Sequence, residues 1–136
     1  MTTVLVSGCF DPFHAGHLLH LEAARQFGDR LVVAVTKDAF VNKGENRPVF
    51  AEDKRLLVVK ALRCVDEAML SESSREALEV VKPQVFVLGM EYRTKICEED
   101  AKFCAENGIT IGFTNEEVFS SSALLTHGIC PTWARV

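Results

Sequence analysis

The sequence predicts a doubly wound α/β fold, in which helices cover both faces of a parallel sheet. Short and continuously apolar runs alternate along the chain with stretches of helical periodicity. Strands that are apolar on both sides are typical of a parallel sheet that is covered on both faces. The chain has 136 residues, of which 48% are hydrophobic, and this suffices for one domain with a continuous core.

The first half of the chain contains two strand–helix units. Apolar strands are predicted at residues 4–6 and 31–35, and helices at residues 17–27 and 52–62. Gly28 follows the first helix and is expected to end it in a left-handed conformation. This order of elements is that of a βαβ unit, whose strands run parallel.

The second half continues the alternation. Ser73 and Glu76 have the spacing of a capping box that opens a short helix, and Pro83 ends that helix. The remaining predicted elements are a strand at 85–88, a helix at 98–107 that Gly108 stops, a strand at 109–113 and a final helix at 120–128. The complete prediction is a single Rossmann-like domain over residues 1–130 with a five-stranded parallel sheet, followed by a tail at residues 131–136.

Composition argues against several function classes. The formal net charge is -4, whereas surfaces that bind nucleic acid or anionic membranes depend on clustered Lys and Arg. The N-terminus lacks a basic segment followed by a long apolar run, and no stretch approaches the roughly 20 apolar residues of a membrane span. We therefore expect a cytoplasmic protein that binds neither nucleic acid nor membranes.

The cysteines indicate reduced thiols. Their number is odd and no two have C-x-x-C spacing, so neither a disulfide framework nor a zinc site is indicated. The five are Cys9, Cys64, Cys97, Cys104 and Cys130. Cys9 lies in the densest motif, where a small residue filling a tight turn is favoured over a nucleophile.

That motif is the segment GCFDPFHAGH at residues 8–17, which joins the first strand to the first helix. In an open parallel sheet, ligands bind at the carboxyl ends of the strands, and a helix N-terminus presents N–H groups to phosphate. His14 and His17 therefore occupy the place where a triphosphate would lie. Their imidazole N–H groups can stabilise the added charge of a five-coordinate phosphorus, and Gly16 allows close approach of the backbone.

Two other interpretations of the histidines remain open. His14 and His17 can simply cap and pack the turn, or they can belong to a metal site. No third ligand lies nearby in the sequence, which disfavours a metal. The paired spacing, the flanking glycines and the position after the first strand favour phosphate chemistry.

Residues 8–17 also resemble the signature G-x-F-D-x-x-H-x-G-H of the cytidylyltransferase-like nucleotidyltransferases, and they match it at every fixed position. The resemblance covers about residues 4–125. Further segments resemble glycerol-3-phosphate cytidylyltransferase and the adenylyltransferase domain that acts on heptose 1-phosphate. They are Ala24 and Arg25, residues 28–35, Asp38, residues 47–49, Arg55 and residues 65–67.

The resemblance implies an activity. CMP or AMP would pass from CTP or ATP to a small phosphorylated polyol or sugar, such as glycerol 3-phosphate or a sugar 1-phosphate. The acceptor would attack in line, pyrophosphate would leave, and Mg²⁺ would arrive with the triphosphate. The family also implies a homodimer.

Site residues follow from the same resemblance. The implied catalytic residues are His14, His17 and Lys43. The implied nucleotide-binding residues are Gly8, Cys9, Phe10, Gly16, Arg55, Gly89, Ser120, Ser121 and Ser122. Asp11 and Asp38 are implied at the acceptor site. Less specific interpretations are a solvated Lys43, a surface ion pair for Arg55 and a helix-capping role for Asp38.

The base and the acceptor stay open at this point. Many family members have an arginine before the serines, but residues 114–119 contain none, and Leu88 stands where the heptose enzymes carry a lysine. A nucleotide-binding module or subunit without catalysis is the second hypothesis. A fragment of a tRNA-charging enzyme is disfavoured, because the chain is acidic and lacks a K-M-S-K-S loop.

Overall fold

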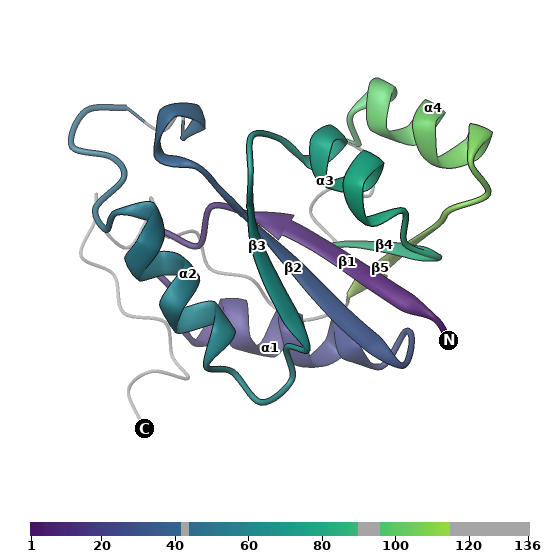
Figure 1. Cartoon of the computed structure of the whole chain (residues 1–136), viewed down its shortest axis with the longest axis horizontal. Coiled ribbons are helices and arrows are strands. Elements are labelled where there is room, and N and C mark those ends of the chain that lie inside the picture. The colour runs from purple at the N-terminus through teal and green to yellow at the C-terminus, as the bar shows by residue number, and fades with distance from the viewer. Residues whose placement is uncertain (42–43, 90–95, 115–136) are drawn as a thin grey trace.

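The computed structural model describes residues 1–41, 44–89 and 96–114. Its five strands run parallel in one sheet, in the order β3-β2-β1-β4-β5 (Figure 1). The strands are β1 (Thr3–Gly8), β2 (Arg30–Thr36), β3 (Glu67–Ser71), β4 (Val85–Gly89) and β5 (Thr110–Thr114). The helices are α1 (Ala15–Arg25), α2 (Glu52–Lys60), α3 (Ser74–Val81) and α4 (Glu98–Glu106), with a 3-10 turn η1 (Asp38–Phe40). The predicted Rossmann-like α/β fold is confirmed.

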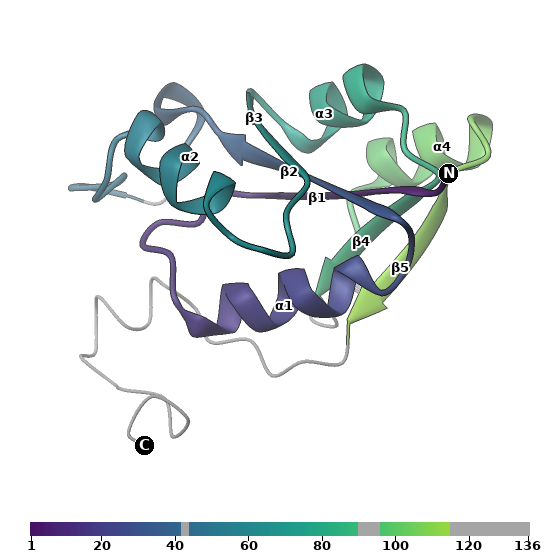
Figure 2. The ribbon, with the colours of Figure 1, turned by 60° about the horizontal axis from the view of Figure 1, so that its bottom comes forward.

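Helices cover both faces of the sheet. Helix α1 runs below the strands in Figure 2, whereas α3 and α4 lie above them. Helix α2 packs on β2 and β3 and contributes Val59 to the same core cluster as Leu21 of α1. The arrangement is doubly wound, as the continuously apolar strands predict.

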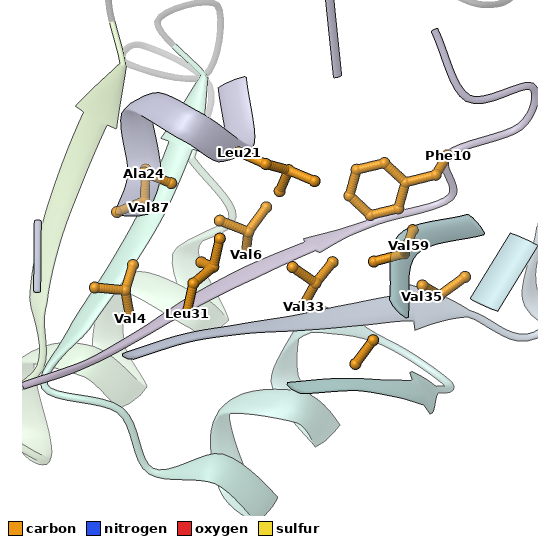
Figure 3. Packing of buried hydrophobic residues seen from close by; sticks show 11 residues of the cluster. Val4, Val6, Phe10, Leu21, Ala24, Leu31, Val33, Val35, Val59 and Val87 are labelled. Atoms are coloured by element: carbon orange, nitrogen blue, oxygen red, sulfur yellow. The ribbon is translucent and has the colours of Figure 1, made fainter. Parts of the chain in front are cut away.

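The core has one hydrophobic cluster on each face because side chains alternate along a strand. On β1, Val4 and Val6 point toward α1, and Leu5 points toward α3 and α4. Figure 3 shows the first cluster, in which the ring of Phe10 lies near Leu21. The turn after β1 is therefore anchored in the core.

Two details of the first helix differ from the prediction. Helix α1 begins at Ala15, two residues early, because the side chain of His14 caps it. Gly28 does not take the predicted left-handed conformation. It is needed for a different reason, since a Cβ there would lie 2.6 Å from the carbonyl oxygen of Thr2.

Two local sequence signals in the second half of the chain correctly predict helix boundaries. Ser73 caps α3, accepting a hydrogen bond from the amide of Glu76 at 3.1 Å. Gly108 follows α4 with a φ of +67°, which confirms it as the stop. The pattern did not locate β3. The predicted helix at 120–128 and the tail at 131–136 lie outside the described residues.

No helix within residues 1–41, 44–89 and 96–114 combines the length and the apolar character that crossing a bilayer requires.

Candidate active site

The turn at residues 8–17 lies at the point where the order in which strands are added to the sheet reverses. From β1 the chain first builds β2 and β3 on one side, and it then crosses over to build β4 and β5 on the other. The carboxyl end of β1 is thus at the topological switch point, where ligands of open α/β sheets bind. The predicted position of the motif is confirmed.

His14 and His17 cap the helix that they introduce. The Nδ1 atom of His14 accepts a hydrogen bond from the amide of Gly16 at 3.1 Å, and Nδ1 of His17 accepts from the amide of His14 at 3.2 Å. A neutral imidazole that accepts at Nδ1 carries its proton on Nε2. The caps therefore fix both rings in the tautomer whose Nε2–H groups can donate hydrogen bonds.

Aromatic packing holds the two rings in place. The rings of His14 and His17 stack with centroids 3.9 Å apart, and the ring of Phe10 meets His17 edge-on at 5.1 Å. The ring of Phe13 lies 5.4 Å from that of His17. Phe10 is buried and has a φ of 52°, which is unusual for a residue with a side chain. The two histidines are thus preorganised beside each other.

The other described residues that the resemblance implies in nucleotide binding lie in the turn or beside it. Gly8 ends β1, Gly16 is buried in the first turn of α1, and the carbonyl of Cys9 accepts a hydrogen bond from Arg55. Gly89 is buried at the end of β4 and pairs with Thr114 in register. All of them lie at the carboxyl end of the sheet or at the N-terminus of α1, as a nucleotide-binding role requires.

Asp11 links the loop at residues 47–50 to the turn through hydrogen bonds. We refer to it as the first of two buried clamps. Its buried carboxylate accepts hydrogen bonds from the amides of Val49 and Phe50, at 2.7 and 2.9 Å, and from Nε of Arg47 at 3.0 Å. Sequence resemblance placed Asp11 at the acceptor site. The geometry instead gives its carboxylate a structural role, because loop donors occupy both oxygens. Contact with an acceptor stays a prediction.

The same donors determine how Asp11 titrates. Burial alone would raise the pKa of this carboxyl. The amides of Phe50 and Val49 and the guanidinium of Arg47 favour the charged form more strongly, so the pKa of Asp11 lies below its ordinary value. The carboxylate and the loop therefore stabilise each other.

Arg55 is a second buried clamp. The side chain donates to the carbonyls of Cys9, Thr36 and Phe50 at 2.7–2.9 Å, and it forms an ion pair with Asp38 at 2.6 Å. The guanidinium is almost fully buried, with 1% of the side chain exposed. Arg55 thus positions the turn from within, in place of the surface pair considered above, and its predicted contact with phosphates stays untested.

Asp38 is the partially exposed member of this ion pair. It is the first residue of η1, and its amide donates to the carboxylate of Glu52 at 2.9 Å. Lys37, not Asp38, is the N-cap of η1, so the helix-capping interpretation is wrong. The side chain keeps 39% of its surface exposed, which leaves the predicted acceptor contact sterically open.

A pocket of about 290 Å³ lies on the α3 and α4 side of the strand ends. Its lining comes from the three central strands β2, β1 and β4, from α3 and α4, and from the two residues before α4. The lining residues are Ser7, Thr36, Ser74, Phe86, Leu88, Ile96, Cys97 and Asp100. Thr36 also donates to the carbonyl of Gly8 at 3.3 Å, so the pocket borders the histidine turn.

The remaining predicted residues cannot be placed. Lys43 and the serines Ser120, Ser121 and Ser122 lie outside the described residues. Within residues 1–41, 44–89 and 96–114, no three His, Cys, Asp or Glu side chains are grouped so that they could hold a metal ion.

Sequence reasoning missed three polar side chains at or near the candidate site. Arg47 was recognised only as part of a family-like segment, and its partner Asp11 is 36 residues away. His20 continues the three-residue spacing of His14 and His17, a signal that was available, and its Nδ1 lies 2.9 Å from the hydroxyl of Thr114. Asp100 resembles an ordinary acidic residue at a helix start, so no local signal distinguished it.

Comparison with known proteins agrees with this geometry. The FAD synthase of Aciduliprofundum boonei is 34% identical over 128 residues, which cover 91% of this chain and 84% of that protein. The bifunctional protein HldE of Pseudomonas entomophila is 45% identical over 95 residues, which cover 67% of this chain and 20% of that protein. The chain thus spans about a fifth of the length of HldE.

A solved structure and a family model match most of the chain. The crystal structure of a lipopolysaccharide core biosynthesis protein from Thermoplasma volcanium has a TM-score of 0.71 and 30% identity, covering 88% of this chain and 99% of that one. The model described as cytidylyltransferase-like matches residues 5–123, which include the turn, the buried clamps and both helices beside the pocket. The chain therefore belongs to the cytidylyltransferase-like family of nucleotidyltransferases.

Proposed function

We propose that the chain transfers AMP from ATP to a small phosphorylated acceptor and releases pyrophosphate. The histidine turn is the observation that carries this proposal. It holds two imidazoles in the Nε2–H tautomer at the N-terminus of α1. Donors fixed beforehand stabilise a developing phosphoryl charge without reorganising during the reaction.

The reaction proceeds by direct displacement. An oxygen of the acceptor phosphate attacks the α-phosphorus, a new P–O bond forms opposite the leaving group, and the bond to the pyrophosphate breaks. His14 and His17 donate to the oxygens that gain charge, and the positive charge of Lys43 contributes as well. No covalent intermediate on the protein is required. Mg²⁺ that arrives with the triphosphate would supply charge neutralisation, and Asp11 would not hold it, because loop donors occupy both oxygens of its carboxylate.

ATP is preferred over CTP in this proposal because of the relatives. FAD consists of AMP joined to FMN, so an FAD synthase performs adenylyl transfer to a phosphorylated ribityl compound. The adenylyltransferase domain that acts on heptose 1-phosphate attaches AMP to a sugar phosphate. Both acceptors carry one phosphate and several hydroxyl groups. We therefore place the acceptor in the pocket on the α3 and α4 side of the strand ends, with its phosphate toward the histidines.

Pyrophosphate release tests this proposal. ATP and CTP are each combined with FMN, heptose 1-phosphate and glycerol 3-phosphate in the presence of Mg²⁺, and products are identified by mass. We expect release with ATP and either FMN or heptose 1-phosphate. Silence across all pairings despite measurable ATP binding would favour the nucleotide-binding module without catalysis.

Replacing His17 with Ala separates chemistry from folding. Loss of one preorganised donor should lower kcat by about 100- to 1,000-fold. Loss of the backbone cap at His14 should cost only about 1 kcal/mol of stability. Turnover and the free energy of unfolding are measured on the same preparation. A variant that is destabilised but keeps its kcat would support a purely capping role.

A further inference from the structure

We propose that Asp100 is a specificity-determining residue that binds the uncharged, hydrogen-bond-donating part of the acceptor. Asp100 acts in the pocket on the α3 and α4 side of the strand ends, where the hydroxyl of Ser74 holds it. The inference rests on the proposed function, because it takes the acceptor to be a phosphorylated compound with hydroxyl groups.

The position of Asp100 is unusual for a carboxylate. The residue is 6% exposed and lies in the first turn of α4, where the helix dipole stabilises a negative charge. Among the described residues no Lys, Arg or His forms an ion pair with it. A buried carboxylate needs hydrogen-bond donors to offset the loss of hydration.

Ser74 supplies only one of the hydrogen-bond donors that the buried carboxylate of Asp100 needs. Its hydroxyl donates to Oδ2 of Asp100 and ties the start of α3 to the start of α4. A carboxylate offers about four acceptor positions, and one hydroxyl satisfies one of them. Asp100 also lines the pocket. Its remaining acceptor capacity is therefore available to a ligand that donates hydrogen bonds.

Charge sets the orientation of that ligand. A phosphate close to Asp100 would meet an anion in a partly desolvated site, and like charges repel strongly there. The pocket also borders the histidine turn, since Ser7 precedes Gly8 and Thr36 donates to its carbonyl. The phosphate of the acceptor thus lies at the turn, and its hydroxyl-bearing part extends toward Asp100.

The pocket suits such a group in size and in character. Its volume of about 290 Å³ is close to the lower end of the roughly 300–1,000 Å³ typical of small-molecule sites. The hydroxyls of Ser7, Thr36 and Ser74 stand beside the apolar side chains of Phe86 and Leu88. Polyol or sugar carbons can pack on the apolar part while their hydroxyls bond to the polar part.

Steady-state kinetics of Asp100→Asn test this role. Asn keeps the shape of the side chain and removes the charge, so hydrogen bonds from the acceptor weaken. We expect the KM for FMN or heptose 1-phosphate to rise about tenfold or more, with the KM for ATP unchanged. Glu99→Gln is the matched control, because it removes the same charge from an exposed neighbour in the same helical turn.

Alkylation of Cys97 gives a readout that needs no turnover. The thiol is exposed and lines the pocket. Iodoacetamide labelling is followed by mass spectrometry of the Cys97 peptide. FMN or heptose 1-phosphate should slow labelling of the wild-type protein and of Glu99→Gln, but not of Asp100→Asn at the same concentration. If Asp100→Asn does not fold, Ser74→Ala replaces it and should show a smaller rise in acceptor KM.

The outcomes separate the two proposals. Protection of Cys97 that depends on Asp100, without transfer, would support the acceptor site and refute the proposed activity. Transfer in which Asp100→Asn behaves like Glu99→Gln would refute the role of Asp100 and leave the activity standing. A loss of stability with an unchanged acceptor KM would make Asp100 a structural link between α3 and α4. Neither transfer nor protection in the wild-type protein would refute both.

Discussion

Replacing Asp11 with Asn should destabilise the fold through the loop at residues 47–50. In the native chain, Oδ2 accepts hydrogen bonds from Val49 and Arg47, and Oδ1 accepts from Phe50. Asn has one acceptor oxygen, so its amide group must face at least one of these donors. The substitution also removes the negative charge that pairs with the guanidinium of Arg47, whose side chain is 7% exposed.

The size of the effect follows from these contacts. An unsatisfied amide at Phe50, whose hydrogen bond to Asp11 is partly buried, costs up to about 1–3 kcal/mol. Breaking a buried ion pair from one side costs about 3–5 kcal/mol in total. We expect a loss of about 3 kcal/mol, because the Asn oxygen retains part of the network. For a chain of this length, that corresponds to a fall of about 10 °C in Tm.

Urea and thermal unfolding followed by circular dichroism measure this loss. Asp29→Asn is the control, since Asp29 is exposed and accepts one hydrogen bond from the amide of Thr2. It should change stability by less than about 0.5 kcal/mol. A loss of less than 1 kcal/mol in Asp11→Asn, of the order of this control effect, would refute the clamp.

The pH dependence of stability tests whether the charge of Asp11 is the cause of the loss. Because the folded pKa of Asp11 lies below its ordinary value, the unfolded chain binds more protons in acid. The stabilisation is complete above the ordinary pKa near 3.8, and it is lost as pH falls through the lower folded value. The difference between wild type and Asp11→Asn should therefore shrink in that acid range. A difference that stays constant would mean that the charge is not responsible.

Two further predictions concern packing of α1. Burial lowers the pKa of His20 from its ordinary value of 6.5, so protonation favours the unfolded chain and stability should fall as pH drops below that value. Urea midpoints from pH 8 to pH 5.5 should show a weaker decline in His20→Gln, and equal slopes would contradict the assignment. Gly28→Ala should cost about 1–3 kcal/mol, since its Cβ would meet the carbonyl of Thr2. Urea unfolding that matches the wild type would show that the turn can shift.

Elements with a strong local signal were predictable from sequence. The apolar runs of β1 and β2 are buried on both faces, and both strands were located. Strand β3 was not, because it is the edge strand beside β2 and its sequence EAMLS lacks β-branched residues. Ala, Met and Leu favour helices, so only pairing with β2 makes this segment a strand.

The candidate site also has one part that was predictable from sequence and another part that was not. The histidine turn was predictable because its residues are contiguous and its function depends on the end of one strand. Apart from Phe50, the partners of Arg55 and all those of Asp11 come from segments 17–46 residues away, and the contacts use charged side chains or backbone groups, so no periodicity connects them. The pocket likewise joins side chains of β1, β2, β4, α3 and α4. Their proximity depends on the order of the strands, which the pattern does not specify.

The two buried clamps make more sense as positioning devices than as sources of stability. Burying Arg55, and Arg47 together with Asp11, costs hydration, and apolar residues of similar volume would stabilise a core at least as well. Both arginines nevertheless bind the backbone of the turn, at the carbonyls of Cys9 and Asp11. Catalysis by fixed donors requires side chains that do not reorganise as charge develops. A turn held from two sides, whose histidines fix their own tautomer, meets that requirement.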